Sequence, residues 1–119
     1  MPPIFKILRR EEWHAAQKAG SFAGSDVDRR DGFIHFSTAA QAQETARRHF
    51  HGQPDLVVLE INAAVLGAVL VWEPSRGGDL FPHLYGILPV GHVVAVHEAP
   101  LDAAGVPDLA FLRIPAANR

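Results

Sequence analysis

Short apolar runs, each long enough for a strand but too short for a stable helix, recur along this chain of 119 residues. They lie at residues 4–8, 56–61, 68–72 and 92–97, and glycine or proline separates each run from the next. Such runs favour strands, and frequent turn residues make a chain fold back on itself. We therefore expect a mostly antiparallel sheet, with a late strand at residues 110–114.

Two segments in the first half of the chain have helical patterns. Residues 11–19 carry apolar side chains at a three-residue spacing, and residues 39–50 are rich in helix formers. The second segment follows Thr38, which with Gln41 three residues later matches a capping box. Residues 21–31, which lie between the two segments, are polar and predict a surface loop. The pattern predicts an α+β fold in which two early helices pack on a bent or split, mostly antiparallel sheet.

Composition narrows the class of protein. The chain is 48% apolar and has a formal net charge of -2, which suits one compact domain and argues against affinity based mainly on nucleic-acid phosphates. It contains no cysteine, so disulfides, thiolate metal sites and a cysteine nucleophile are excluded. The first residues lack an export signal, and no apolar run is long enough to cross a membrane. We expect a cytoplasmic protein with no membrane partner.

A histidine lies within an aromatic run at residues 32–38. On a strand, His35 and Ser37 share one face, since side chains two positions apart point the same way. Ser37 and Thr38 also lie where the strand gives way to a helix, whose unpaired N–H groups favour an anion such as phosphate. The alternative is that His35 is a core histidine bonded to a backbone carbonyl, and that Ser37 or Thr38 only caps the helix.

A second histidine lies in a similar run at residues 81–86. If this run is extended, His83 and Tyr85 share a face, and each has a polar tip on an apolar body. Gly77 and Gly78 precede it, and a glycine pair lets backbone amides approach a ligand closely. The alternative is a plain hairpin connection.

Other polar clusters are weaker candidates. His49 and His51 lie at the end of the second helix, where surface exposure is more common than metal binding. There is no nucleophile elbow, P-loop or dinucleotide-binding glycine motif. Three arginine pairs are either solvated surface or, if the fold brings them together, a phosphate-binding rim. They are Arg9-Arg10, Arg29-Arg30 and Arg47-Arg48.

Four segments of this chain, taken together, resemble those of a bacterial protein family that is called domain of unknown function 952. They are residues 32–38, 72–75, 77–78 and 81–89. The resemblance covers about residues 4–98, which leaves residues 99–119 as a C-terminal extension of a single domain over residues 1–119. It implies an ADP-ribosyltransferase-like fold, whose members bind NAD or ADP-ribose in a cleft of a split antiparallel sheet.

Within that superfamily, residues 34–37 resemble the second half of the His-x-His-x-Ser segment of RNA 2′-phosphotransferases. The resemblance implies that His35 lies against the nicotinamide-ribose or phosphate side of a pocket, with Ser37 nearby. It also makes Glu73 a candidate for the acidic residue that orients a ribose hydroxyl or the acceptor. Arginines for the phosphates are not matched position by position, and Arg76 is one candidate, besides Arg9 and Arg10.

Transfer of ADP-ribose passes through an oxocarbenium-like ribose, so such a site must hold the diphosphate and stabilise positive charge. We expect catalytic roles for His35, Glu73, His83 and Tyr85. Contacts to NAD or a related nucleotide are expected from Ser37, Thr38, Arg76, Gly77 and Gly78. No metal is expected, and the acceptor, RNA or protein, stays open. A non-catalytic module that senses a small molecule is the alternative function, and a metal site on His35, His83 and Glu73 is a third.

Overall fold

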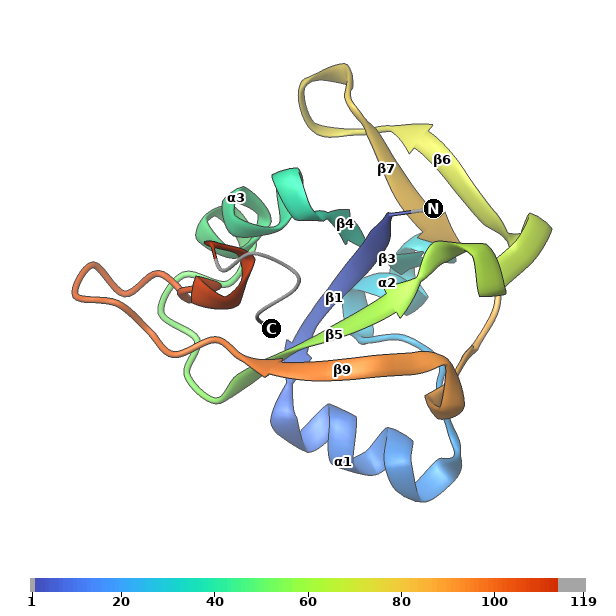
Figure 1. Cartoon of the computed structure of the whole chain (residues 1–119), viewed down its shortest axis with the longest axis horizontal. Coiled ribbons are helices and arrows are strands. Elements are labelled where there is room, and N and C mark those ends of the chain that lie inside the picture. The colour runs from blue at the N-terminus through green and yellow to red at the C-terminus, as the bar shows by residue number, and fades with distance from the viewer. Residues whose placement is uncertain (1, 114–119) are drawn as a thin grey trace.

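The computed structural model describes residues 2–113 and contains nine strands, three α-helices and several 3-10 turns (Figure 1). The strands are β1 (Pro3–Arg9), β2 (Ser21–Phe22), β3 (Ile34–His35), β4 (Ser37–Thr38), β5 (Leu56–Asn62), β6 (Leu70–Pro74), β7 (Leu80–Leu84), β8 (Leu88–Pro89) and β9 (Val93–Glu98). The helices are α1 (Arg10–Ala19), α2 (Asp26–Asp31) and α3 (Ala39–His49). The 3-10 turns are η1 (Ala63–Val69), η2 (Arg76–Gly78), η3 (Val90–His92) and η4 (Ala110–Arg113).

All strand pairs are antiparallel, and they form separate small sheets. The largest has the order β4-β1-β5-β9, a second has the order β3-β7-β6, and β2 pairs with β8. This confirms the predicted α+β fold with a split antiparallel sheet. No helix within residues 2–113 is both long and apolar enough to cross a bilayer.

A single bent segment connects the two main sheets. β3 pairs with β7 and β4 pairs with β1, and only Phe36 lies between β3 and β4. The N–H of Phe36 donates to the carbonyl of Pro82 at 3.0 Å, so the chain stays bonded to β7 until it turns toward β1. The sheet therefore splits at the segment that carries His35 and Ser37.

The central strands are buried on both faces, which explains their nearly continuous apolar sequence. Alternate residues of β1 and β5, such as Ile4 and Leu59, enter one core cluster with Trp13 of α1. The intervening residues, such as Phe5, enter a second cluster with Ala42 of α3. Figure 1 shows α1 and α3 on opposite sides of this sheet.

Two sequence predictions were wrong in their details. Residues 21–31 are not a loop, since they contain β2 and the short helix α2, which begins after Ser25. The N–H of Ser25 donates to Asp28 Oδ2 at 2.8 Å, a reciprocal cap that the polar composition concealed. Residues 110–113 form a 3-10 turn in place of the late strand, because the N–H of Leu112 bonds back to the carbonyl of Leu109. Residue 114 lies outside the described residues.

The two helices predicted from the sequence are present with nearly the expected boundaries. The second helix begins after Thr38, whose N–H donates to Gln41 Oε1 at 3.0 Å, so this half of the expected capping box is present. Part of the expected C-terminal extension packs onto the core, since Leu109 is fully buried in the cluster that contains Phe5.

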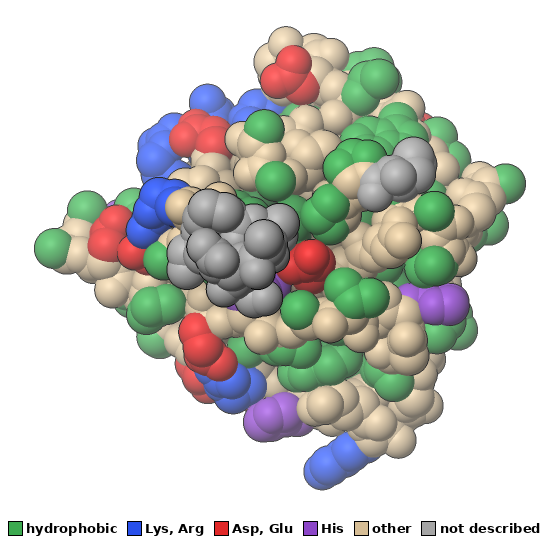
Figure 2. Space-filling model, in the orientation of Figure 1, with side chains coloured by type: hydrophobic (Ala, Val, Ile, Leu, Met, Phe, Trp, Pro, Cys, Tyr) green, Lys and Arg blue, Asp and Glu red, His purple; other side chains and the backbone are tan. Residues whose placement is uncertain are grey.

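Charged side chains of both signs are mixed at the surface. On the face shown in Figure 2, basic and acidic side chains lie next to each other and form no field of one sign. Ion pairs such as Arg10 with Asp55, at 2.8 Å, produce this mixture. It agrees with the formal net charge of -2.

Two leucines of β7 offer a test of the core. Leu84 is fully buried, whereas Leu80, on the same strand, is 52% exposed. We expect Leu84→Ala to lower the free energy of unfolding by about 2–5 kcal/mol, since it removes buried methyl groups and leaves a cavity. Leu80→Ala, the matched control, should change it by less than about 1 kcal/mol. Chemical denaturation measures both, and equal losses would contradict this description of β7.

Candidate functional site

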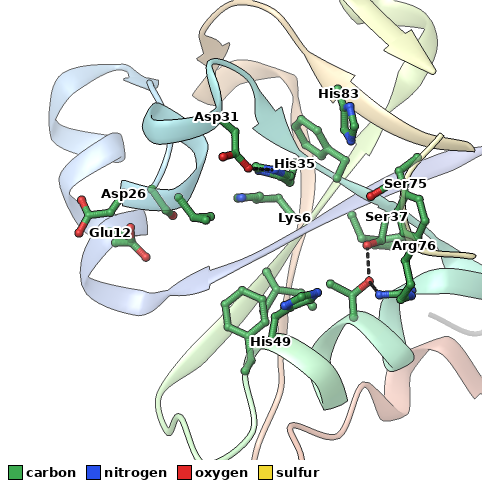
Figure 3. Close-up of a pocket in the computed structure, with 18 of the residues that line it drawn as sticks. Lys6, Glu12, Asp26, Asp31, His35, Ser37, His49, Ser75, Arg76 and His83 are labelled. Carbon is green, nitrogen blue, oxygen red and sulfur yellow. Dashed lines mark hydrogen bonds and ion pairs between the residues drawn. The ribbon is translucent and has the colours of Figure 1, made fainter. Parts of the chain in front are cut away.

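A cavity of about 780 Å³ opens between β1, α2, the β3–β4 segment, α3 and the start of β7. Four of the residues predicted from sequence line it, namely His35, Ser37, Arg76 and His83. They come from segments that are far apart in the chain. In Figure 3, Arg76 and Ser37 lie on one side of the cavity and Asp26 on the other, with His35 between them.

His35 is held between two carboxylates. Its Nδ1 lies 2.5 Å from Asp28 Oδ1, and its Nε2 lies 2.9 Å from Asp31 Oδ2. Ionised carboxylates only accept hydrogen bonds, so this geometry requires both ring nitrogens to donate. Both ring nitrogens of His35 are therefore occupied by carboxylates, and neither is free for a further hydrogen bond.

Asp28 is the centre of this arrangement and is 1% exposed. Its carboxylate also pairs with Lys6 Nζ at 2.8 Å and accepts hydrogen bonds from the N–H groups of Ser25 and His35. Burial alone would raise the pKa of Asp28, but the hydrogen bond to His35 and the charge of Lys6 hold it well below its ordinary value. Burial lowers the pKa of Lys6, and the Asp28 carboxylate partly offsets that effect.

The second histidine belongs to a separate hydrogen-bonded group. Glu73 Oε1 lies 2.8 Å from Nδ1 of His83 and accepts a hydrogen bond from the Tyr85 hydroxyl at 2.7 Å. These bonds from Tyr85 and His83 lower the pKa of Glu73, while the bond to Glu73 raises the pKa of Tyr85. Glu73 is then a carboxylate and Nδ1 of His83 the donor, so Nε2 of His83 takes no part in this group. Among residues 2–113, Nε2 has no hydrogen-bond partner.

The two histidines lie side by side on neighbouring strands. They are direct partners in the β3–β7 register, and their ring centroids are 5.6 Å apart. The ring of Phe33 stacks on His83 at 4.1 Å and lies 4.6 Å from His35. The two histidine segments are therefore adjacent in the fold, and both histidines line the cavity.

On another side of the cavity, hydroxyl groups hold Arg76. Arg76 Nη1 donates to Thr45 Oγ1 at 3.3 Å, and Ser37 Oγ lies 3.0 Å from the same oxygen. The guanidinium also lies over the ring of Phe81, 4.9 Å from its centroid. Burial and the charges of Arg76 and Arg48 lower the pKa of His49, which lines the cavity from the end of α3. Arg76 therefore places a cation on this side of the cavity.

The remaining predicted residues lie outside the lining. Glu73 bonds to His83 and Tyr85 bonds to Glu73, and neither lines the cavity. Thr38 caps α3, and Gly77 and Gly78 form a turn in which both have positive φ, the reason for glycine there. The N–H of Gly78 is bonded to the Ser75 carbonyl, so it does not cradle a ligand in this structure.

The three arginine pairs do not come together to form a phosphate-binding rim at the cavity. Arg9 and Arg30 line the cavity, but Arg9 pairs with Glu11 and Glu12, and Arg30 pairs with Asp31 at 3.0 Å. The other members pair with carboxylates elsewhere. Ion pairs with neighbouring carboxylates therefore largely neutralise the charges of these six arginines.

Several residues at or next to the cavity were not predicted from the sequence. Lys6, Asp28, Asp31 and Thr45 have no motif around them, and Asp28 and Asp31 fell within the segment predicted to be a loop. One signal was present, namely a lysine in the middle of the apolar run at residues 4–8. A buried lysine needs an anionic partner, but the sequence does not say which carboxylate supplies it.

The geometry of residues 2–113 does not support a metal site on His35, His83 and Glu73. No group of three or more histidine or carboxylate side chains is arranged there to hold an ion. Glu73 bonds to His83 Nδ1, whereas both nitrogens of His35 face carboxylates.

Fold and site together define a small α+β protein with a split antiparallel sheet and two histidines at one cavity. The chain matches the family described as Protein of unknown function (DUF952) over residues 7–96, well over half of its length. It belongs to this family. The match confirms the family suggested by the histidine segments.

Solved structures of one bacterial protein, CC0527 from Caulobacter crescentus, are similar along nearly the whole chain. Its crystal structure is 52% identical, covers 94% of this chain and 99% of that chain, and superposes with a TM-score of 0.92. A crystal structure of a double mutant is 50% identical with a TM-score of 0.91, over 94% of this chain and 99% of that chain. The solution NMR structure is 53% identical with a TM-score of 0.83, over 93% and 96%. No curated protein matches the chain.

The Asp28 carboxylate gives a prediction about pH. Because its pKa lies below the ordinary value of 3.8, the unfolded chain binds more protons there, and the stabilisation is complete above about pH 4 and lost as pH falls. We expect Asp28→Asn to cost about 3–5 kcal/mol at pH 7, because it leaves the Lys6 charge buried without a partner. The difference from wild type should shrink as pH falls below about 4.

Denaturation at pH 7 and at low pH measures this difference. Asp26→Asn is the matched control, since its side chain is 98% exposed on the same helix and its pair with Arg29 should contribute less than about 1 kcal/mol. A loss for Asp28→Asn that is the same at both pH values would show that the carboxylate charge is not what stabilises the site.

Proposed function

We propose that this cavity binds a nucleotide-phosphate ligand of the NAD type and supports transfer of its ADP-ribosyl or phosphoryl group. The observation that carries the proposal is the convergence of His35, Ser37, Arg76 and His83 on one cavity. These residue types suit a ligand that combines an anionic phosphate with a ring or a ribose. A volume of about 780 Å³ is of the size that binds such small molecules.

The composition of the walls supports the same ligand class. Phe5, Phe36 and Phe81 contribute apolar surface, which can cover a base or a ring. Arg76 contributes a cation, and its charge, after burial, lowers the pKa of the neighbouring His49. The split sheet also supports an ADP-ribosyltransferase-like assignment, because that superfamily places its ligand in a cleft of such a sheet.

In ADP-ribosyl transfer, the bond between nicotinamide and ribose C1′ breaks, and its electron pair leaves with nicotinamide. An acceptor hydroxyl or water then bonds to C1′ and releases a proton. His83 is suited to take that proton, since Nδ1 donates to Glu73 and Nε2 has no described partner. In this proposal Glu73 and Tyr85 are positioning residues that act through His83.

His35 has a different role in the proposal. Both of its nitrogens face carboxylates, so it can contact and orient a ligand with its ring but is not suited to accept a proton. The same observation favours the second candidate, a non-catalytic module that binds a small molecule. The two candidates differ in turnover and not in the position of the ligand.

Incubation with NAD and with ADP-ribose tests the proposal. We expect both to raise the melting temperature, because a ligand that binds only the folded state stabilises it, by about 2.7 kcal/mol at one hundred times Kd. Nicotinamide release, followed by chromatography, should occur with wild type and fall by roughly 100-fold or more in His83→Ala, the scale of a lost general base. Glu73→Gln should lower the release rate with less effect on ADP-ribose affinity.

His51→Ala is the control, since His51 bonds to the carbonyl of Ala104 and does not line the cavity. Binding without nicotinamide release in wild type and in His35→Ala alike would favour the non-catalytic module. Failure of both NAD and ADP-ribose to stabilise the protein would contradict the proposed ligand class.

A further inference from the structure

Arg76 differs from every other arginine within residues 2–113. The others form ion pairs with carboxylates, at Arg9, Arg10, Arg29, Arg30, Arg47, Arg48 and Arg113. Arg76 forms no ion pair in the described part of the chain, although it lines the cavity. Its charge therefore has no counterion there.

The guanidinium of Arg76 is nevertheless held in place. Nη1 donates to Thr45 Oγ1 at 3.3 Å, and Cζ lies over the Phe81 ring, 4.9 Å from its centroid. A guanidinium has five N–H donors, and only the bond from Nη1 has an acceptor among residues 2–113. Donors that are pre-oriented but unused are what a bidentate contact to an oxyanion requires.

A chain of hydroxyl groups fixes the residue that holds Arg76. Thr45 Oγ1 donates to the Gln41 carbonyl at 3.1 Å, so its oxygen is left to accept from Arg76 and from Ser37. Ser37 is only 4% exposed, so the buried end of this row of hydroxyl groups is held in place by packing. Gln41 in turn donates from Nε2 to the Leu80 carbonyl at 2.8 Å, which ties α3 to β7.

The charges around Arg76 also favour an anion. The pKa of His49 is lowered first by burial and then by Arg76, so the neutral imidazole adds no second charge but can still donate one hydrogen bond. The carboxylates that line the cavity are Glu12, Asp26 and Asp31. Figure 3 shows all three on the side of the cavity away from Arg76.

We infer that Arg76 is the phosphate-binding residue of the cavity and that Thr45 is its positioning residue. The phosphate belongs to a larger molecule, since the cavity is far larger than the space one ion needs. For the identity of that molecule, the inference rests on the proposed function. Ser75, which also lines the cavity here, supplies a further hydroxyl.

Calorimetric titration with inorganic pyrophosphate, and separately with ADP-ribose, tests this subsite. We expect Arg76→Gln to weaken both by roughly ten- to one-hundredfold, the scale of one or two charge-assisted hydrogen bonds. Thr45→Val should weaken both by a smaller factor, and Thr45→Ser, which keeps the hydroxyl, should restore wild-type affinity. Arg47→Gln is the control, since Arg47 lies on α3 but is paired with Glu44 and does not line the cavity.

The results separate this inference from the proposed function. Pyrophosphate binding that depends on Arg76, without any binding of ADP-ribose, would support the subsite and contradict the nucleotide ligand. Binding of ADP-ribose with unchanged affinity in Arg76→Gln would overturn the subsite and leave the proposed function in place. Equal losses in Thr45→Val and Thr45→Ser would overturn the positioning role of the Thr45 hydroxyl. Melting temperatures of all variants show whether each is folded.

Discussion

One wall of the cavity depends on the buried pair of Lys6 and Asp28. The carboxylate of Asp28 joins three segments, because it binds Lys6 on β1, caps α2 at Ser25 and holds both the backbone and the ring of His35. Burying a carboxylate is costly unless every oxygen is bonded, and here both oxygens are. The pair therefore fixes α2 against β1 and sets the position of His35, whatever the cavity binds.

The split of the sheet places the other functional groups. Since residues 34–38 pair first with β7 and then with β1, His35 comes next to His83 while Ser37 comes next to α3. One short segment thus contributes to the histidine group and to the Arg76 group. A flat continuous sheet would put His35 and Ser37 on one face with the same neighbours. The bend at Phe36 gives them different partners.

The two histidines have different chemical environments, although their sequences look alike. His35 has a carboxylate at each nitrogen, whereas His83 has one at Nδ1 and none described at Nε2. This asymmetry gives each a separate role in the proposed function, one in orientation and one in proton transfer. Arg76 adds a third group, because its charge has no carboxylate partner among residues 2–113 and lies on the side where phosphate is proposed to bind.

The sequence by itself determined the class of fold, the main strands, two helices and the two histidine segments. These follow from local causes, namely apolar periodicity, the Thr38–Gln41 cap and the glycine and proline residues at turns. It missed α2, because that helix is short, polar and stabilised by contacts outside itself.

Only the tertiary structure decided which residues form the cavity. Lys6 and Asp28 are 22 positions apart, and Thr45 and Arg76 are 31 apart, so no spacing along the chain reveals either contact. It also decided that Glu73 supports His83, and that Gly77 and Gly78 shape a turn outside the lining. Local sequence sets the conformation of each segment, but long-range packing sets the neighbours of its side chains, and the chemistry of this site depends on those neighbours.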